Sequence, residues 1–141
     1  MMNSPTAPSE ARKKFSVTVP ESILLAIDHF REQGDGTRSE AAQQIFQFAM
    51  TALGRSRLFC FHRETWPLVI FDEPRKIAVF EWFPSQDRFL LDLSQKLLGK
   101  RNRSEIFRVL TVLYGVERQL LRLASVERLQ LTALPHPPLP H

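Results

Sequence analysis

One compound pattern occurs twice in this chain of 141 residues, and the repetition restricts the fold more than any single segment does. The pattern is a short β-prone run that ends in proline, an amphipathic helix that glycine ends, and a second helix that begins at a capping residue followed by Arg-Ser-Glu. Pro20 precedes Arg38 by 18 positions, and Pro84 precedes Arg103 by 19. Two such units with nearly equal spacing predict an internal duplication.

The β-prone run of the first copy, "KKFSVTVP", alternates apolar with polar residues. Phe15, Val17 and Val19 share one face of a predicted strand over residues 14–19, which Pro20 ends. A single short strand is not stable in water, so this strand must pair with another. The linker is long enough for the second β-prone run, "KIAVFEWF", to be its partner in the same molecule.

Local signals predict the two helices of the first copy at about residues 22–33 and 38–53. Thr37 is a favourable N-cap, and Glu40, three residues later, completes the signature of a capping box. Gly54 follows the apolar stripe of the second helix and is typical of a helix C-terminus.

The second copy repeats these signals. Ser85 is expected to cap a helix over about residues 86–98, which Gly99 ends. Asn102 is expected to cap the last helix. Because the apolar positions continue, this helix is predicted to extend to about Leu131.

An apolar seam follows the last predicted helix in steps of four and three residues. Its members are Val109, Leu113, Val116, Leu120 and Leu123. A core helix packed on its own domain is the favoured interpretation, and a seam for a second chain is the alternative.

Charge and composition restrict the setting of the protein more than its activity. The formal net charge is +4 and the isoelectric point about 9.7, which suits an anionic partner but is also common among other soluble proteins. Cys60 is the only cysteine, so no intrachain disulfide can form. Because no signal peptide and no apolar run of membrane-spanning length is found, we expect a soluble cytoplasmic protein that makes no membrane contact.

The sequence does not support catalysis or metal binding. Cys60 and His62 have no second pair of ligands at metal-binding spacing. The Ser, His and Asp residues are not arranged as a nucleophile with a base, and no glycine-rich phosphate loop occurs. We therefore expect no enzyme, no cofactor and no metal ion.

The duplicated unit resembles the ribbon-helix-helix fold of Arc- and Met-repressor-type DNA-binding proteins. "FSVTVPES", "GDGTRSEA" and the following apolar stripe occur in the order of that family. The second copy keeps "FP", Gly99 and "NRSEI" but has a poorer strand. Both matches together cover over half of the chain, and their specificity comes from order, spacing and repetition.

The resemblance implies a mainly α fold with a short antiparallel β-ribbon, formed by tandem ribbon-helix-helix units as an intrachain pseudo-dimer. With the resemblance, composition and β-propensity divide the chain into five parts. They are a disordered N-terminal arm at 1–11, a first unit at 12–54, a linker with extra strands or a β-hairpin at 55–75, a second unit with an extended C-terminal helix at 76–132, and a proline-rich tail at 133–141.

The resemblance also implies roles for single residues. The ribbon of this family enters the DNA major groove, and the second helix of each unit holds a phosphate at its N-terminus. Lys14, Ser16 and Thr18 would then contact bases. The residues expected to contact phosphates are Arg12, Lys13, Arg38, Ser39, Lys100, Arg101, Arg103 and Ser104.

The second strand does not fit this role in either of its two registers. Counted from Pro84, Ala78, Phe80 and Trp82 would face outward and Glu81 would face the core. In the other register, the outward residues would be Ile77, Val79, Glu81 and Phe83. The first register makes Phe80 and Trp82 candidate contacts for a partner protein, because two exposed aromatic side chains form an apolar patch.

Two functions therefore remain. The first is a DNA-binding protein, a transcriptional regulator or repressor or an accessory factor of plasmid maintenance or conjugation, with double-stranded DNA as its partner. The second is a protein-binding pseudo-dimer whose DNA binding is reduced or lost, with a toxin or nucleoprotein partner at the apolar second strand or at the C-terminal helix. A monomeric pseudo-dimer is favoured over a homodimer.

Overall fold

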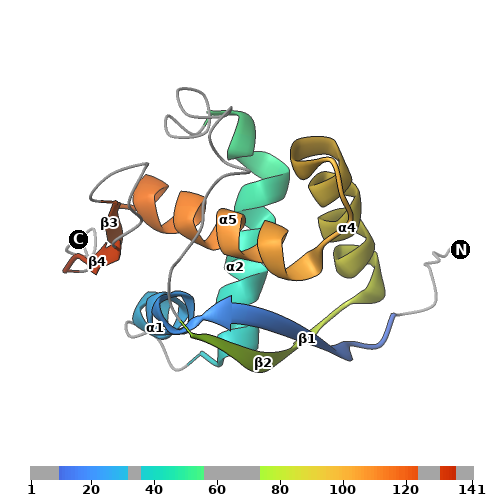
Figure 1. Cartoon of the computed structure of the whole chain (residues 1–141), viewed down its shortest axis with the longest axis horizontal. Coiled ribbons are helices and arrows are strands. Elements are labelled where there is room, and N and C mark those ends of the chain that lie inside the picture. Colours follow the sequence, from blue (N-terminus) through green and yellow to red (C-terminus); the bar gives the residue numbers. More distant parts are fainter. Residues whose placement is uncertain (1–9, 32–35, 56–73, 124–130, 136–141) are drawn as a thin grey trace, which may run out of the picture.

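The computed structural model describes residues 10–31, 36–55, 74–123 and 131–135, in a mainly helical fold with two-stranded antiparallel sheets (Figure 1). Two strand–helix–helix units follow each other in the chain. The elements are β1 (Lys13–Pro20), α1 (Glu21–Phe30), α2 (Arg38–Thr51), a 3₁₀ turn (Leu53–Arg55), β2 (Arg75–Trp82), α4 (Pro84–Leu98), α5 (Arg103–Glu117), β3 (Leu121–Leu123) and β4 (Leu131–Ala133).

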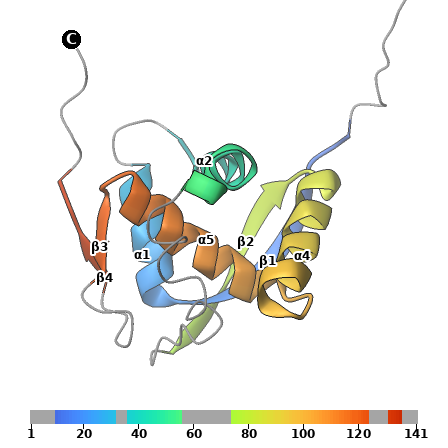
Figure 2. The same ribbon diagram turned by 90° about the horizontal axis from the view of Figure 1, so that it is seen from above.

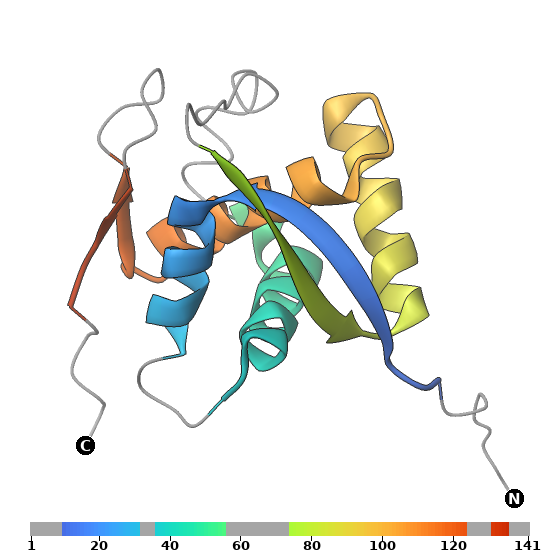
Figure 3. The same ribbon diagram turned by 60° about the horizontal axis from the view of Figure 1, so that its bottom comes forward.

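The strands of the two units pair with each other, as the sequence predicts. β1 and β2 form an antiparallel ribbon in which Phe15 lies opposite Phe80 and Val17 lies opposite Ala78. These residues face the helices, which cover one side of the ribbon and leave the other side uncovered (Figure 3). The two units therefore build one common core.

The register of β2 contradicts the expectation that Phe80 and Trp82 face outward. Both side chains are fully buried, so they are not available to a partner protein. The Trp82 ring lies 5.0 Å from that of Phe46 and 5.5 Å from that of Phe107, and its indole N–H donates to Asp87. Burial of two large aromatic rings, with a partner for the indole, favours this register over the other.

Predicted caps begin the second helix of each unit. The Thr37 side chain accepts a hydrogen bond from the Glu40 amide at 3.2 Å, and the Asn102 side chain accepts one from the Glu105 amide at 3.0 Å. Gly99 ends α4 in the left-handed region, with φ of 75°, where a residue without Cβ is not strained. These local signals are confirmed.

The start of α4 differs from the prediction, because Ser85 lies inside the helix rather than at its cap. Pro84 occupies the first helical position, where its missing N–H costs nothing. The Gln86 side chain accepts from the Phe83 amide at 3.0 Å. The Ser85 amide and hydroxyl both donate to the carboxylate of Glu10, each at 2.6 Å. A carboxylate from outside the helix thus satisfies the N-terminus of α4.

The last helix is shorter than predicted. α5 ends at Glu117 instead of continuing to about Leu131. Gln119 has a positive φ of 59°, and the Leu120 amide donates to the Gly115 carbonyl at 2.8 Å, which closes the helix end with a bond of the Schellman type. The chain then reverses.

The reversal depends on a close approach at Gly115. A Cβ atom built there would lie 2.3 Å from Leu121 Cδ1 and 2.9 Å from Phe30 Cζ. Only glycine leaves room for the buried Leu121 to pack against the helix. The hairpin of β3 and β4 that follows lies beside α1 and α5, at the end of the molecule away from α4 (Figure 2).

The apolar seam of α5 belongs to the core of its own chain. Val109, Leu113 and Leu120 are buried, and Val116 packs against the core with partial exposure. This confirms the favoured interpretation. Among the seam side chains that the structure describes, only Val116 keeps part of its surface exposed.

Several sequence-based predictions lie outside the described residues. They are the N-terminal arm up to residue 9, the linker hairpin over 56–73 with Cys60 and His62, and the tail from residue 136. In the part of the chain that is described, no helix has both the length and the apolar character needed to cross a membrane.

Candidate nucleic-acid interface

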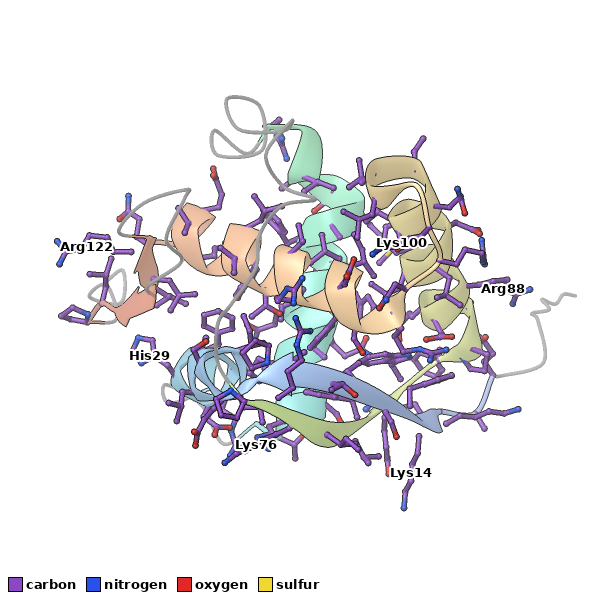
Figure 4. The ribbon with its side chains drawn as sticks, viewed as in Figure 1. Lys14, His29, Lys76, Arg88, Lys100 and Arg122 are labelled. Atoms are coloured by element: carbon purple, nitrogen blue, oxygen red, sulfur yellow. The ribbon has the colours of Figure 1, made fainter. Side chains whose placement is uncertain are left out.

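The uncovered side of the ribbon, called here the outer ribbon face, consists of three cross-strand pairs. Lys14 lies opposite Glu81, Ser16 opposite Val79 and Thr18 opposite Ile77, and all six residues are exposed. Figure 4 shows Lys14 projecting from the ribbon away from α2, α4 and α5. The face combines donors, one acceptor carboxylate and two apolar side chains.

Two reciprocal hydrogen bonds hold the second helices against the edges of the ribbon. The Thr18 amide of β1 donates to Ser104 Oγ of α5 at 2.8 Å. The Glu81 amide of β2 donates to Ser39 Oγ of α2 at 2.9 Å. The N-termini of α5 and α2 therefore flank the ribbon, one at each edge, and each serine joins one unit to the strand of the other.

Arg38, expected to contact phosphate, is held by a carboxylate. Its Nε and NH2 atoms donate to the two oxygens of Asp28 at 2.8 and 2.9 Å. This bidentate contact lowers the pKa of Asp28 and raises the pKa of Arg38. Arg31 adds a second ion pair to Asp28 at 3.2 Å. The guanidinium of Arg38 thus already binds an anion.

Arg103 is held in the same way, and more deeply. Its guanidinium makes a bidentate contact with the buried carboxylate of Asp87, and this contact raises the pKa of Arg103. Its Cζ atom lies 5.1 Å from the centre of the Phe15 ring. Asp87 also accepts from Trp82. Arg103 therefore helps to close the core under the ribbon.

Two other cations near the N-terminus of α5 make weaker contacts. Lys100 pairs with Glu105 at 3.0 Å, and Arg101 pairs with Asp92 at 2.7 Å. Both cations are about half exposed, and surface pairs of this kind contribute only about 0–1 kcal/mol. Because these ion pairs contribute so little free energy, both cations can release their carboxylate and bind a phosphate instead.

Three consecutive cations precede and begin β1. Arg12 Cζ lies 5.3 Å from the centre of the Phe83 ring, and Lys13 and Lys14 are exposed. Within the described ranges, no carboxylate forms an ion pair with Lys13 or Lys14. This end of the ribbon therefore carries three exposed cations in a row.

Sequence reasoning missed the two carboxylates that bind the arginines. Asp28 lies in α1 and Asp87 in the first turn of α4, so their spacing to Arg38 and Arg103 differs between the units and gives no repeated signal. It also left open the exposure of Ile77 and Val79, which are 74% and 56% exposed.

Among the described residues, no group of three His, Cys, Asp or Glu side chains is placed to hold a metal ion. The chain matches no protein-family model, no curated protein and no solved structure. The geometry of the outer ribbon face and its flanking helices is therefore the basis for any functional assignment.

Proposed function

We propose that this chain is a DNA-binding protein of the ribbon-helix-helix type, whose tandem units form a pseudo-dimer within one chain. One observation carries the proposal. The exposed donors Lys14, Ser16 and Thr18 lie on a two-stranded ribbon that the N-termini of α2 and α5 flank. A cytoplasmic transcriptional regulator, or an accessory factor of plasmid maintenance or conjugation, is the role that suits this arrangement.

The dimensions of the ribbon support a major-groove contact. Two paired strands lie about 4.8 Å apart, and the major groove, about 12 Å wide, admits a two-stranded ribbon. In the proposed complex, Lys14 donates to guanine, while Ser16 and Thr18 bond to several bases. The uncovered side of the ribbon gives the groove access without any change in the core.

Phosphate contacts would come from both edges of the ribbon. Free amides and the positive dipole end of α2 and α5 attract anions at their N-termini. Arg12, Lys13, Lys100 and Arg101 supply exposed positive charge. Arg38 and Arg103 act mainly by positioning, since Asp28 and Asp87 bind their guanidinium groups, and Ser39 and Ser104 act by fixing the helices to the strands.

Salt-dependent binding tests the proposal. Fluorescently labelled duplexes, first of random sequence and then enriched by selection, are titrated with the full chain between about 50 and 200 mM salt. Each phosphate contact is expected to contribute about 0.9 to the slope of log affinity against log salt. The absence of any salt-sensitive binding would sink the DNA-binding function.

Lys14→Ala is the decisive variant, and Lys96→Ala is its matched control. Both remove one exposed lysine, but Lys96 lies in the last turn of α4, away from the end that joins the ribbon. Lys14→Ala is expected to weaken specific binding about tenfold, because a good base contact contributes about 1–3 kcal/mol of discrimination. Equal losses in both variants would indicate a general charge effect instead.

A second candidate function is a protein-binding pseudo-dimer with weak or no DNA binding. The exposure of Ile77 and Val79, beside the negative charge of Glu81, favours it. This candidate requires that the affinity for DNA is weak or absent for every duplex sequence. It also requires that Ile77→Ser and Val79→Ser abolish binding of a purified partner while the fold remains intact.

A further inference from the structure

The two ends of the outer ribbon face have different chemistry. At one end, Lys14 lies opposite Glu81, so a cation and a carboxylate share one position along the ribbon. At the other end, Thr18 lies opposite Ile77, so two methyl-bearing side chains share one position. The pair between the ends is Ser16 and Val79.

An approximate two-fold relation between the units exchanges these ends. The reciprocal bonds of Thr18 to Ser104 and of Glu81 to Ser39 make Thr18 and Glu81 equivalent positions. Thr18 and Glu81 are as far apart in the sequence as Lys14 and Ile77, so Lys14 is equivalent to Ile77. The Lys14–Glu81 end therefore corresponds to the Ile77–Thr18 end. In a homodimer of identical strands the two ends would be identical, and such a ribbon suits a palindrome. Here they are not.

Each end matches a different base pair. Lysine donates to O6 and N7 of guanine, and glutamate accepts from N4 of cytosine. Because residues directly opposite in a ribbon are about 5 Å apart, Lys14 and Glu81 can contact the two bases of one G·C pair. Ile77 and the Thr18 methyl group offer apolar contact to the C5-methyl group of thymine.

The spacing along the ribbon is compatible with the spacing of the bases. Residues two apart on one face are about 6.6 Å apart. Two base-pair steps of about 3.4 Å each cover nearly the same distance. The two ends of the outer ribbon face are therefore about four base-pair steps apart.

Charge favours a nucleic acid as the occupant of this face. The six-residue face itself carries one cation, Lys14, and one carboxylate, Glu81. Exposed cations extend it at both ends, Arg12 and Lys13 next to Lys14, and Arg75 and Lys76 next to Ile77. A second copy of the chain is a poor occupant, because six outward residues are far fewer than the roughly 20–30 that each partner of a stable interface contributes.

We propose, on the basis of the DNA-binding function above, that the ribbon reads a non-palindromic site in one orientation. A G·C pair lies under the Lys14–Glu81 end, with guanine toward Lys14. A·T pairs, whose thymine methyl groups contact Ile77 and Thr18, lie about four steps away.

Selection from a pool of random duplexes with the full chain tests the orientation. The expected result is an asymmetric consensus with G·C at one end and A·T at the other. A palindromic consensus, or G·C at both ends, overturns this inference and leaves the DNA-binding function standing. If no duplex binds in a salt-sensitive way, the DNA-binding function fails and the inference fails with it.

Base analogues then test each end separately. Replacing the contacted thymine by deoxyuridine removes one methyl group and should weaken binding of the wild type about threefold to fivefold. The same replacement should have no effect on the Ile77→Ala, Thr18→Ser double variant, which lacks both methyl contacts. A thymine outside the stretch that the ribbon covers is the matched control. Equal losses at both thymines overturn the methyl contact.

For the other end, exchange of G·C for A·T should weaken wild-type binding about tenfold. The exchange should weaken binding far less in the Lys14→Ala, Glu81→Gln double variant. Since all the substituted side chains are exposed, the variants should keep the wild-type circular dichroism spectrum and melting temperature, which are measured first. The same tenfold loss in the double variant overturns the assignment of this base pair to Lys14 and Glu81.

Discussion

Ser104 Oγ accepts a hydrogen bond from the Thr18 amide at 2.8 Å, across 86 positions of sequence. The bond connects the last helix to the first strand, at an edge amide that the ribbon itself leaves unpaired. Together with the bond from Glu81 to Ser39, it holds the ribbon between the two second helices.

Ser104→Ala is expected to reduce the free energy of unfolding by about 0.5–1.5 kcal/mol, the usual contribution of one hydrogen bond. Ser39→Ala should have a similar effect. Because the two bonds lie on opposite edges of the ribbon, the double variant should show additive losses. Urea titration measures all three variants, and an unchanged midpoint for both single variants would contradict the structural role of the serines.

Asp87→Ala should destabilise the fold far more than Asp28→Ala. The first change leaves the half-buried Arg103 guanidinium and the buried Trp82 N–H without their shared carboxylate, which we expect to cost about 3 kcal/mol. The second removes a more exposed pair that contributes about 0–1 kcal/mol. Parallel urea titrations compare the two variants, and equal losses would show that burial does not distinguish the two arginine–aspartate pairs.

The Asp28–Arg38 pair also predicts a dependence on pH. The hydrogen bond from Arg38 lowers the pKa of Asp28 in the folded protein. The stabilisation that ionised Asp28 contributes is therefore complete above the unfolded pKa of about 3.9. It is lost as the pH falls through the lower pKa of Asp28 in the folded protein. The difference in unfolding free energy between the wild type and Asp28→Asn should be largest near pH 7 and decrease as the pH falls through the lowered folded pKa of Asp28. A difference that does not change with pH would contradict the ion pair.

Gly115→Ala should destabilise the protein although alanine favours helices. The added Cβ would overlap Leu121 and Phe30, and the burial of Leu121 limits its retreat. Overpacking of this kind costs about 1–3 kcal/mol. Gly54→Ala is the control, because a Cβ there meets no atom within 4 Å. A melting temperature of Gly115→Ala at or above that of the wild type would show that the hairpin is not packed on α5 as described.

The pairing of β1 with β2 inside one chain predicts a monomer. Sedimentation equilibrium should give a mass near 16.3 kDa across the micromolar range. A constant mass of twice this value would instead indicate a dimer in which β1 of each chain pairs with β2 of the other.

Features that depend on neighbouring residues were predictable from the sequence, and features that depend on tertiary contacts were not. The N-caps Thr37 and Asn102 and the stop at Gly99 were predictable, because each depends on the preferences of a few neighbouring residues. The alternation that ends in "VP" likewise predicted β1. The family resemblance extended these local signals to a paired ribbon.

The register of β2 was not predictable, because apolar residues occupy both of its faces. Only the fit of Phe80 and Trp82 into the shared core, with Asp87 accepting from the indole, turns Ile77, Val79 and Glu81 outward. The candidate interface depends on this choice, since a shift of one residue exchanges the two faces of a strand.

The sequence by itself determined the repeated order of strand, helix and helix, and the residues at which the second helices begin. The tertiary structure decided which face of β2 is exposed, where α5 ends and which carboxylates bind Arg38 and Arg103. The physical reason is the range of the interactions. Caps and periodicity act within about one helical turn, whereas Leu121 on Gly115 and the aromatic core under the ribbon depend on side chains that only the complete fold brings together.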